Sequence, residues 1–294
     1  MYDFLNTLSG LIWGPITLIL ILGTGIFLSL GLKGFTFTYI LAAFKQIFKK
    51  DEKAADGEIT SFQSLTTALS ATVGTGNIAG VATAIYIGGP GAVFWMWVSA
   101  LFGMATKYAE AFLAIKYREK NANGETVGGP MYYIKNGLSK NYIIFAYLFA
   151  LAGMIAALGI GNGVQVNSVS QVIENEFGIS AFTVGIFIAL LVALVILGGI
   201  KSIGKITSKL VPLMSAIYIL GGLWIIVLNY TEVTYIFNLI TTSAFTSTAA
   251  TGGFAAATVW MALRYRVARG VFSDEAGLGS SPIAHAAANT NNPA

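Results

Sequence analysis

The sequence contains no cysteine, only one histidine (His285), and few charged residues, which make up 10% of its 294 residues. The absence of cysteine excludes disulfides, Cys-ligated zinc and iron–sulfur sites, and thiol nucleophiles. One histidine cannot build a multi-histidine metal site, and we expect His285 to be a solvated loop residue. Soluble domains carry about 25% charged residues. The scarcity of charge, with 55% hydrophobic residues and a mean hydropathy of +0.73, therefore predicts a membrane protein.

Seven apolar segments are long enough to cross a bilayer as helices, and we expect one transmembrane domain over 1–294. No cleavable signal peptide of the usual form is expected, because Lys and Arg are absent from the start of the chain and the first apolar run is too long. The predicted spans are 11–32, 60–88, 92–117, 142–168, 181–200, 211–228 and 235–263.

The basic residues indicate how these spans are oriented. Every Lys and Arg except Lys107 falls on one side of the predicted topology, which the positive-inside rule makes cytoplasmic. The net charge of +4 is thus a topology signal and predicts no nucleic-acid partner. We expect a multi-pass protein of the plasma (inner) membrane, in contact with lipid and with its N-terminus outside. The predicted cytoplasmic loops are 33–59, 118–141, 201–210 and 264–280, and the part 36–50 of the first is expected to lie on the membrane surface as a helix.

The second span contains residues that disfavour a helix at mid-membrane. Gly74, Gly76 and Gly80, together with neighbouring threonines and Asn77, lie near its centre. This pattern predicts a broken helix, whose freed backbone groups and half-helix ends form a site for a zwitterion or a small cation. The alternative is a continuous glycine-rich helix packed closely against a neighbour.

The seventh segment has a similar interruption at 246–253, rich in Ser, Thr and Gly. It begins five spans after the second and runs in the opposite direction, as an inverted repeat of five helices requires. We therefore predict an all-α membrane protein in which spans two to six form one repeat and the seventh opens a second, incomplete one.

A site between the two breaks can be assigned from these residues. The backbone N–H groups near Thr75, Gly76 and Asn77 would bind an amino-acid carboxylate, and carbonyls from Ala71 to Gly74 would coordinate Na⁺. Uncharged polar side chains that both donate and accept hydrogen bonds complete the predicted substrate site without the cost of a buried charge. The alternative for the polar residues is a structural hydrogen bond between helices, of about 0.6 kcal/mol. The predicted substrate contacts are Thr75, Gly76, Asn77, Asn162, Gln165, Phe245, Thr246 and Gly252, and the predicted Na⁺ ligands are Ala71, Gly74 and Thr246.

Enzymatic functions fit the sequence poorly. The glycine spacing is not that of a dinucleotide fingerprint, and no Walker A sequence is present. No nucleophile–base pair is evident, and no cofactor other than Na⁺ as coupling ion is expected. Asp274 and Glu275 are interpreted as a gate latch or a turn in a cytoplasmic loop. Lys107, three residues before Glu110, is interpreted as one half of an ion pair on one helix face, with a proton or ion relay as the alternative.

Several motifs resemble one known family. The segments 89–103 (GPGAVFWMWVSALFG), 75–80 (TGNIAG), 128–132 (GGPMY), 200–204 (IKSIG) and 271–279 (VFSDEAGLG) are similar to those of the alanine-or-glycine:cation symporters, also called the sodium:alanine symporter family. The resemblance covers almost the whole chain.

The resemblance implies a leucine-transporter-like (APC-type) fold with an added N-terminal helix, and Na⁺-driven symport of alanine or glycine. By this resemblance Thr75, Gly76 and Asn77 match the unwound substrate helix and Gln165 a polar substrate contact. Members of this family have about eleven spans, whereas this chain has seven. We therefore expect a fragment or truncated form that does not complete a transport cycle. The alternative function is a non-transporting membrane subunit or a channel-like pore, and the oligomeric state stays open.

Overall fold

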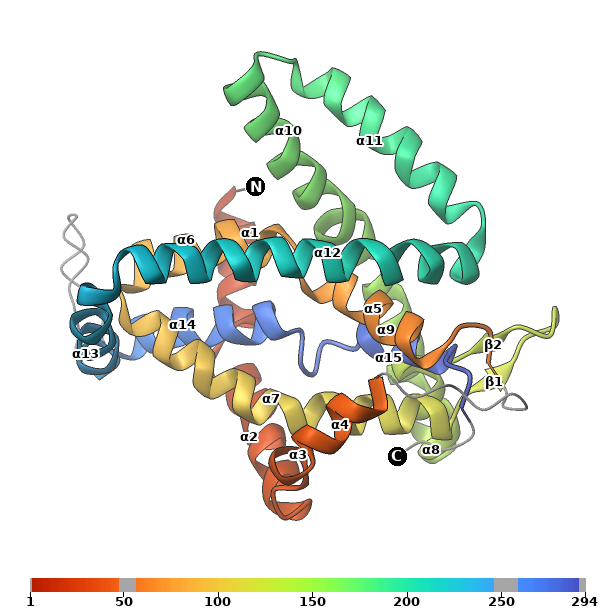
Figure 1. Ribbon diagram of the computed structural model, residues 1–294. Coiled ribbons are helices and arrows are strands. Elements are labelled where there is room, and N and C mark those ends of the chain that lie inside the picture. The colour runs from red at the N-terminus through yellow and green to blue at the C-terminus, as the bar shows by residue number, and fades with distance from the viewer. Residues whose placement is uncertain (1, 48–56, 246–258, 291–294) are drawn as a thin grey trace. The chain divides into compact units, whose positions relative to one another are not determined.

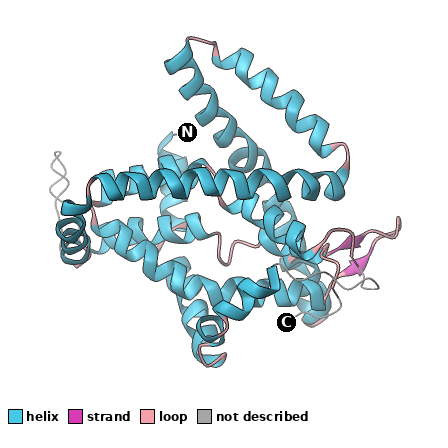
Figure 2. Ribbon diagram, in the orientation of Figure 1, coloured by secondary structure: helices cyan, strands magenta, loops and turns pink. Residues whose placement is uncertain are grey.

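The computed structural model describes residues 2–47, 57–245 and 259–290, and these residues are almost entirely helical (Figure 1; Figure 2). They fall into two compact units, each of which combines distant parts of the sequence. The first unit comprises Met1–Leu41, Gly76–Ala109 and Ala216–Leu278, and the second comprises Ala42–Thr75, Glu110–Ser215 and Gly279–Ala294.

The first unit is built from helices of the N-terminal, central and C-terminal parts of the chain. Its elements are α1 (Tyr2–Ile12), α2 (Pro15–Gly31), α3 (Phe35–Thr38), α6 (Thr75–Gly88), the start of α7 (Gly91–Lys116), the end of α12 (Gly199–Leu228), α13 (Val233–Ser243) and α14 (Val259–Asp274). Leu18 of α2 packs with Val267 and Val271 of α14 in a buried cluster. Gly25 lets α2 lie close to α7, because a Cβ there would be 2.9 Å from the Phe102 carbonyl oxygen.

The second unit contains most of the remaining elements. These are α4 (Ile40–Ile47), α5 (Ser61–Thr72), β1 (Glu119–Lys120), β2 (Thr126–Val127), α8 (Pro130–Gly137), α9 (Ile143–Ala156), α10 (Gln165–Phe177), α11 (Ala181–Ile196), α15 (Ser281–Ala286), the end of α7 and the start of α12. A π-helical segment, Ala157–Val164, joins α9 to α10. The strands form an antiparallel hairpin in which Glu119 pairs with Val127.

Local sequence signals explain where several of these helices begin and end. A capping box opens α5: the Thr60 hydroxyl accepts from the Gln63 N–H at 3.1 Å, and the Gln63 side chain accepts from the Thr60 N–H at 3.0 Å. Gly178, at φ 70°, ends α10 in the left-handed conformation that glycine adopts without strain.

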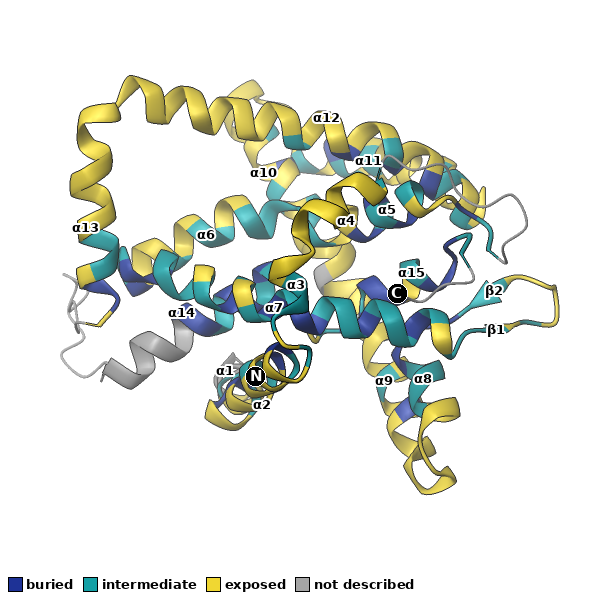
Figure 3. Ribbon diagram, turned by 60° about the horizontal axis from the view of Figure 1, so that its bottom comes forward, coloured by how far each residue is buried: buried dark blue, intermediate teal, exposed yellow. Residues whose placement is uncertain are grey.

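Much of the apolar surface is exposed, as expected for helices that face lipid. Phe182 and Leu197 are 79% and 86% exposed, and Figure 3 shows α12 exposed along most of its length. Among the described residues, four helical stretches are long and apolar enough to cross a membrane, and α2 and α11 are shorter apolar helices. The four stretches are Ser61–Gly88, Gly91–Lys116, Lys140–Phe177 and Gly199–Leu228.

Two predicted loops are largely helical in the structure. The predicted loop 201–210 lies inside α12, and its Lys201, Lys205 and Lys209 recur every four residues on an exposed helix face. Helix α14 extends through the first part of the predicted loop 264–280 and ends at Asp274. Basic residues do not end a helix when they can reach water or find acceptors, so the clusters of Lys and Arg were misleading about helix boundaries.

After α14 the chain turns before it enters α15. Glu275, Gly277 and Gly279 have φ values of 52°, 84° and 80°, so the turn contains three left-handed positions within five residues. In the second unit, a Cβ at Gly279 would lie 2.6 Å from a side-chain carbon of Pro130. Its N–H donates to the Glu110 carboxylate at 3.2 Å. Glycine is therefore required at this position by both its conformation and its close contacts.

His285 is not the solvated residue that the sequence predicted. In α15 its Nδ1 lies 3.0 Å from the hydroxyl of Ser64 on α5, and Ser64 is 1% exposed. This contact joins two segments more than 200 residues apart, which no local sequence pattern reveals.

Within the second unit, Arg118 holds the end of α15 and the residues that follow it. Its guanidinium donates to the carbonyls of Ala286, Ala288 and Thr290 at 3.0, 2.8 and 2.6 Å. We expect Arg118→Met to lower the free energy of unfolding by about 2–3 kcal/mol, because hydrogen bonds from a charged donor contribute about 1.5–3 kcal/mol. The measurement is thermal unfolding of the purified protein in detergent.

The matched control is Lys135→Met. Lys135 donates to the Glu119 carboxylate at 3.0 Å, and this hydrogen bond is the main cause that lowers the pKa of Glu119. Exposed ion pairs contribute little, so we expect the control to unfold close to the wild-type temperature. An equal shift for both variants would contradict the role given to Arg118.

Candidate functional site

The predicted break in the second span is present. Helix α5 ends at Thr72, Val73 is extended (φ −92°, ψ 102°), and α6 begins at Thr75. In a continuous helix the Thr75 N–H would donate to the Ala71 carbonyl, four residues earlier. Here it donates instead to the Gln165 Oε1 at 3.1 Å. The break thus removes the helical donor of the Ala71 carbonyl and leaves an N-terminal helix dipole at Thr75.

Within the second unit, Gln165 is the side chain that reaches this break. Its Oε1 also accepts from the Thr75 hydroxyl at 2.7 Å. A Cβ at Gly74 would lie 3.1 Å from both amide heteroatoms of Gln165, which is a tight contact. A glycine at this position therefore lets the glutamine approach the helix end, and the structure brings together the predicted site residues Gly74, Thr75 and Gln165.

Within the first unit, the start of α6 contacts the end of α14. The Asn77 amide donates to the hydroxyl of Ser273 at 2.9 Å and to its carbonyl at 3.3 Å. The Arg269 guanidinium donates to the Gly76 carbonyl. The predicted site residues Gly76 and Asn77 are therefore held by two side chains of α14 that lie four residues apart.

A second arginine of α14 is buried completely. Arg266 is 2% exposed and donates to the carbonyls of Gly88, Ser243 and Ala244 at 2.7, 3.1 and 3.2 Å. Trp95 also donates to the Ala244 carbonyl, at 2.9 Å. These acceptors lie at the C-terminal ends of α6 and α13, where carbonyls lack helical partners and a positive charge is favoured by the helix dipole.

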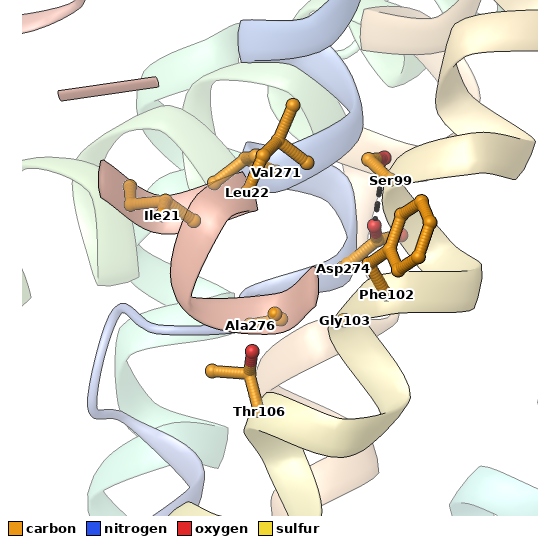
Figure 4. Close-up of a pocket in the computed structure, with 10 residues that line it drawn as sticks. Ile21, Leu22, Ser99, Phe102, Gly103, Thr106, Val271, Asp274 and Ala276 are labelled. Atoms are coloured by element: carbon orange, nitrogen blue, oxygen red, sulfur yellow. Dashed lines mark hydrogen bonds between the residues drawn. The ribbon is translucent and has the colours of Figure 1, made fainter. Parts of the chain in front are cut away.

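Asp274 lies in a small pocket of the first unit lined by α2, α7 and α14 and by Ala276 of the following turn (Figure 4). The pocket has room for about one water-sized group. The Ser99 hydroxyl donates to the Asp274 carboxylate at 3.0 Å, and the charge of Lys107 acts on the same carboxylate. The sequence placed Asp274 in a cytoplasmic loop; in the structure it is the last residue of α14 and accepts from a serine of α7.

Of the other predicted site residues, Ala71 lies in the last turn of α5, directly before the break, whereas Asn162 and Phe245 have other contacts. Asn162 is exposed, and its amide donates to the Ala157 carbonyl of its own π-helical segment at 3.2 Å. Phe245 packs edge-on against Phe94 and Trp95 in the first unit, and Ala71 is exposed. Thr246 and Gly252, with the predicted second break at 246–253, lie outside the described residues.

Sequence reasoning missed four polar residues of this region. They are Ser99, Arg266, Arg269 and Ser273. The two arginines were counted as cytoplasmic loop charges, although a helical reading of 259–274 would have placed Arg269 and Ser273 on one face, four residues apart.

Comparison with known proteins shows to which family this chain belongs. A profile of the sodium:alanine symporter family matches residues 1–294. The chain belongs to the sodium:alanine symporter family. The resemblance found in the motifs is thereby confirmed. The sodium:alanine symporter family is a family of transporters and not of enzymes, which also agrees with the expectation from the sequence. Family membership and the apolar helices together make this a multi-pass membrane protein.

Individual relatives within the sodium:alanine symporter family align over nearly all of the chain. The sodium/alanine symporter AgcS of Methanococcus maripaludis is 52% identical over 99% of this chain and 64% of its own length. The putative sodium/proton-dependent alanine carrier protein YrbD of Bacillus subtilis is 42% identical, over 100% and 59%. The probable sodium/glutamine symporter GlnT of the same organism is 36% identical, over 97% and 58%. The chain thus spans about three fifths of the length of these relatives.

Proposed function

We propose that the full-length protein is a secondary active transporter that couples Na⁺ to the symport of a small neutral amino acid, alanine or glycine, across the plasma membrane. Membership of the sodium:alanine symporter family and the name of the relative AgcS support this class of activity. The observation that carries the proposal is the break between α5 and α6, where Gln165 accepts from the N–H of Thr75.

The break offers two kinds of binding group at one point of the chain. Thr75, Gly76 and Asn77 are the first residues of α6, and their N–H groups form the positive end of a helix dipole, which suits a substrate carboxylate. The Gln165 amide oxygen accepts from Thr75 in the way that a carboxylate oxygen would. In our proposal, the bound substrate carboxylate accepts hydrogen bonds from some of these N–H and hydroxyl groups in place of Gln165.

The opposite side of the break suits a cation. The Ala71 carbonyl belongs to the last turn of α5 and has lost its helical donor, because the Thr75 N–H points to Gln165. Carbonyls at the C-terminal end of a half-helix provide the oxygen ligands and negative potential that Na⁺ prefers. We propose that the Ala71 and Gly74 carbonyls bind Na⁺, with the Thr246 hydroxyl as a further ligand.

The proposed fold around this site is the leucine-transporter-like inverted repeat, with the N-terminus outside and the basic loops 33–59 and 118–141 in the cytoplasm. One finding supports it: α5 and α6 form one interrupted stretch long enough to span a membrane. Alternating access around the first break would then expose the same N–H and carbonyl groups to each side in turn.

The test is uptake of alanine into proteoliposomes that contain the full-length gene product, with and without an inward Na⁺ gradient. We expect saturable, Na⁺-dependent uptake, which Asn77→Ala reduces about tenfold or more because it removes the contact with Ser273 and alters the proposed carboxylate site. Glycine, glutamine and a proton gradient belong in the same panel, since relatives bear names that include glutamine and protons.

Binding measurements separate the symporter from the alternative of a pore. In a symporter, Na⁺ and alanine each raise the affinity for the other by the same factor. Ion conductance without saturable, coupled uptake would instead favour the pore.

A further inference from the structure

The first two turns of α6 present a face without side chains. Gly76 and Gly80 lie four residues apart, and therefore one above the other on the helix. The Arg269 guanidinium of α14 occupies this face within the first unit. Its Nη2 donates to the Gly76 carbonyl, a Cβ at Gly76 would lie 3.3 Å from Nη2, and a Cβ at Gly80 would overlap the guanidinium itself.

The guanidinium is held in place by its surroundings. Its carbon lies 5.0 Å from the centroid of the Phe272 ring, a cation–π distance. Phe272 in turn packs edge-on against Trp13, with 6.2 Å between the ring centroids. The Nε atom of Arg269 is buried and has no hydrogen-bond partner among the residues that the structure describes. The position of the guanidinium is therefore determined by packing and by the Gly76 carbonyl.

A second contact joins the same two helices one turn further along α14. Ser273 accepts from the Asn77 amide at 2.9 Å. Arg269 and Ser273 are four residues apart and lie on one face of α14, opposite the first turn of α6. Together they fix the orientation of the turn that contains Gly76 and Asn77.

We infer that Arg269 is a positioning residue for substrate binding, and that Gly76 and Gly80 are glycines because their side chains would displace its guanidinium. The inference deepens the proposed function and rests on it, because the turn that Arg269 orients supplies the N–H groups proposed to bind the substrate carboxylate. Arg269 acts through α6 and needs no contact with the substrate. Displacing the guanidinium is therefore expected to weaken substrate binding more than it slows the maximal rate of transport.

The test is a double-mutant cycle of Gly80→Ala and Arg269→Ala in the full-length gene product, read out as Na⁺-dependent alanine uptake. We expect Gly80→Ala to raise the half-saturating alanine concentration about tenfold in the wild-type background, because the new methyl group overlaps the guanidinium. In the Arg269→Ala background the space is empty, and the same substitution is expected to change that concentration less than about twofold.

Two further variants sharpen the cycle. Gly221→Ala in α12 is the matched control, because a Cβ there meets nothing within 4 Å; we expect wild-type uptake. Arg269→Lys keeps the charge but lacks the planar group that spans Gly76 and Gly80. It is expected to raise the half-saturating concentration, and to tolerate Gly80→Ala better than the wild type does.

The outcomes distinguish this inference from the proposed function. If the wild type transports alanine and Gly80→Ala has the same effect in both backgrounds, the inference is wrong and the proposed function stands. A wild type without Na⁺-dependent uptake overturns the proposed function, and with it the role in substrate binding. The contact between the guanidinium and Gly80 is then checked by thermal unfolding of the same four proteins in detergent. Additive shifts there would contradict the contact as well.

Discussion

Replacing Arg266 with methionine is expected to lower the free energy of unfolding by about 3 kcal/mol or more. Methionine fills much of the space of the arginine stem but donates no hydrogen bond. The carbonyls of Gly88 and Ser243 would then lose their Arg266 donor while they stay buried. Each buried polar group without a partner costs about 1–3 kcal/mol.

The size of this effect follows from the kind of acceptor. A buried ion pair can be replaced by apolar residues at little cost, because both charges leave together. The acceptors of Arg266 are backbone carbonyls at the ends of α6 and α13, which no side-chain substitution removes. The loss of the arginine therefore leaves their desolvation uncompensated.

The measurement is thermal unfolding of the purified protein in detergent, with Lys205→Met as the control. Lys205 is exposed on α12, and substitutions of exposed residues away from such contacts change stability by about 0.5 kcal/mol or less. A similar unfolding temperature for the Arg266 and Lys205 variants would mean that water or other donors satisfy the three carbonyls.

The second large effect is expected at Gln165. Gln165→Leu removes the acceptor of both the N–H and the hydroxyl of Thr75. On the proposed function it also removes a contact to the substrate. Two lost hydrogen bonds of about 1.4 kcal/mol each correspond to about a hundredfold loss of Na⁺-dependent alanine uptake at low alanine concentration.

Substitutions at Thr75 isolate one of these two hydrogen bonds. Thr75→Val keeps the shape of the side chain but loses the hydroxyl that donates to Gln165 at 2.7 Å. We expect about a three- to tenfold loss of uptake, while Thr75→Ser, which keeps the hydroxyl, is expected to lose less.

The matched control for Gln165→Leu is Gln171→Leu on the same helix, where the glutamine is exposed. Equal uptake by the Gln165 and Gln171 variants would contradict the assignment of Gln165 to the site.

The features that depend on local chemistry were predictable from the sequence. Glycines and threonines near the centre of an apolar segment predict an interrupted helix, and the structure has the interruption at Val73 and Gly74. Gln165 could be named beforehand because a polar, uncharged side chain in a span needs a partner, and Thr75 provides one. The roles of these residues in transport stay predictions.

The features that depend on distant partners were not predictable. Arg266 and Arg269 were interpreted as loop charges because the acceptor carbonyls of Gly88 and Gly76 lie 178 and 193 residues away in the sequence. The same reasoning applies to His285, whose partner Ser64 belongs to α5. A backbone carbonyl is available at every position, so no sequence pattern marks which carbonyl will receive a buried arginine.

The π-helical segment Ala157–Val164 sets the angular phase of the residues that follow it. A π-turn contains about one residue more than an α-turn, so this segment rotates α10 about its axis relative to a regular continuation of α9. Gln165 is the first residue after this segment, and the rotation decides which side of α10 bears its amide. Loss of a single residue from the segment would turn Gln165 away from Thr75 without changing either side chain. The direction of the Gln165 amide thus depends on the number of residues in the preceding segment and not on the side chains of that segment.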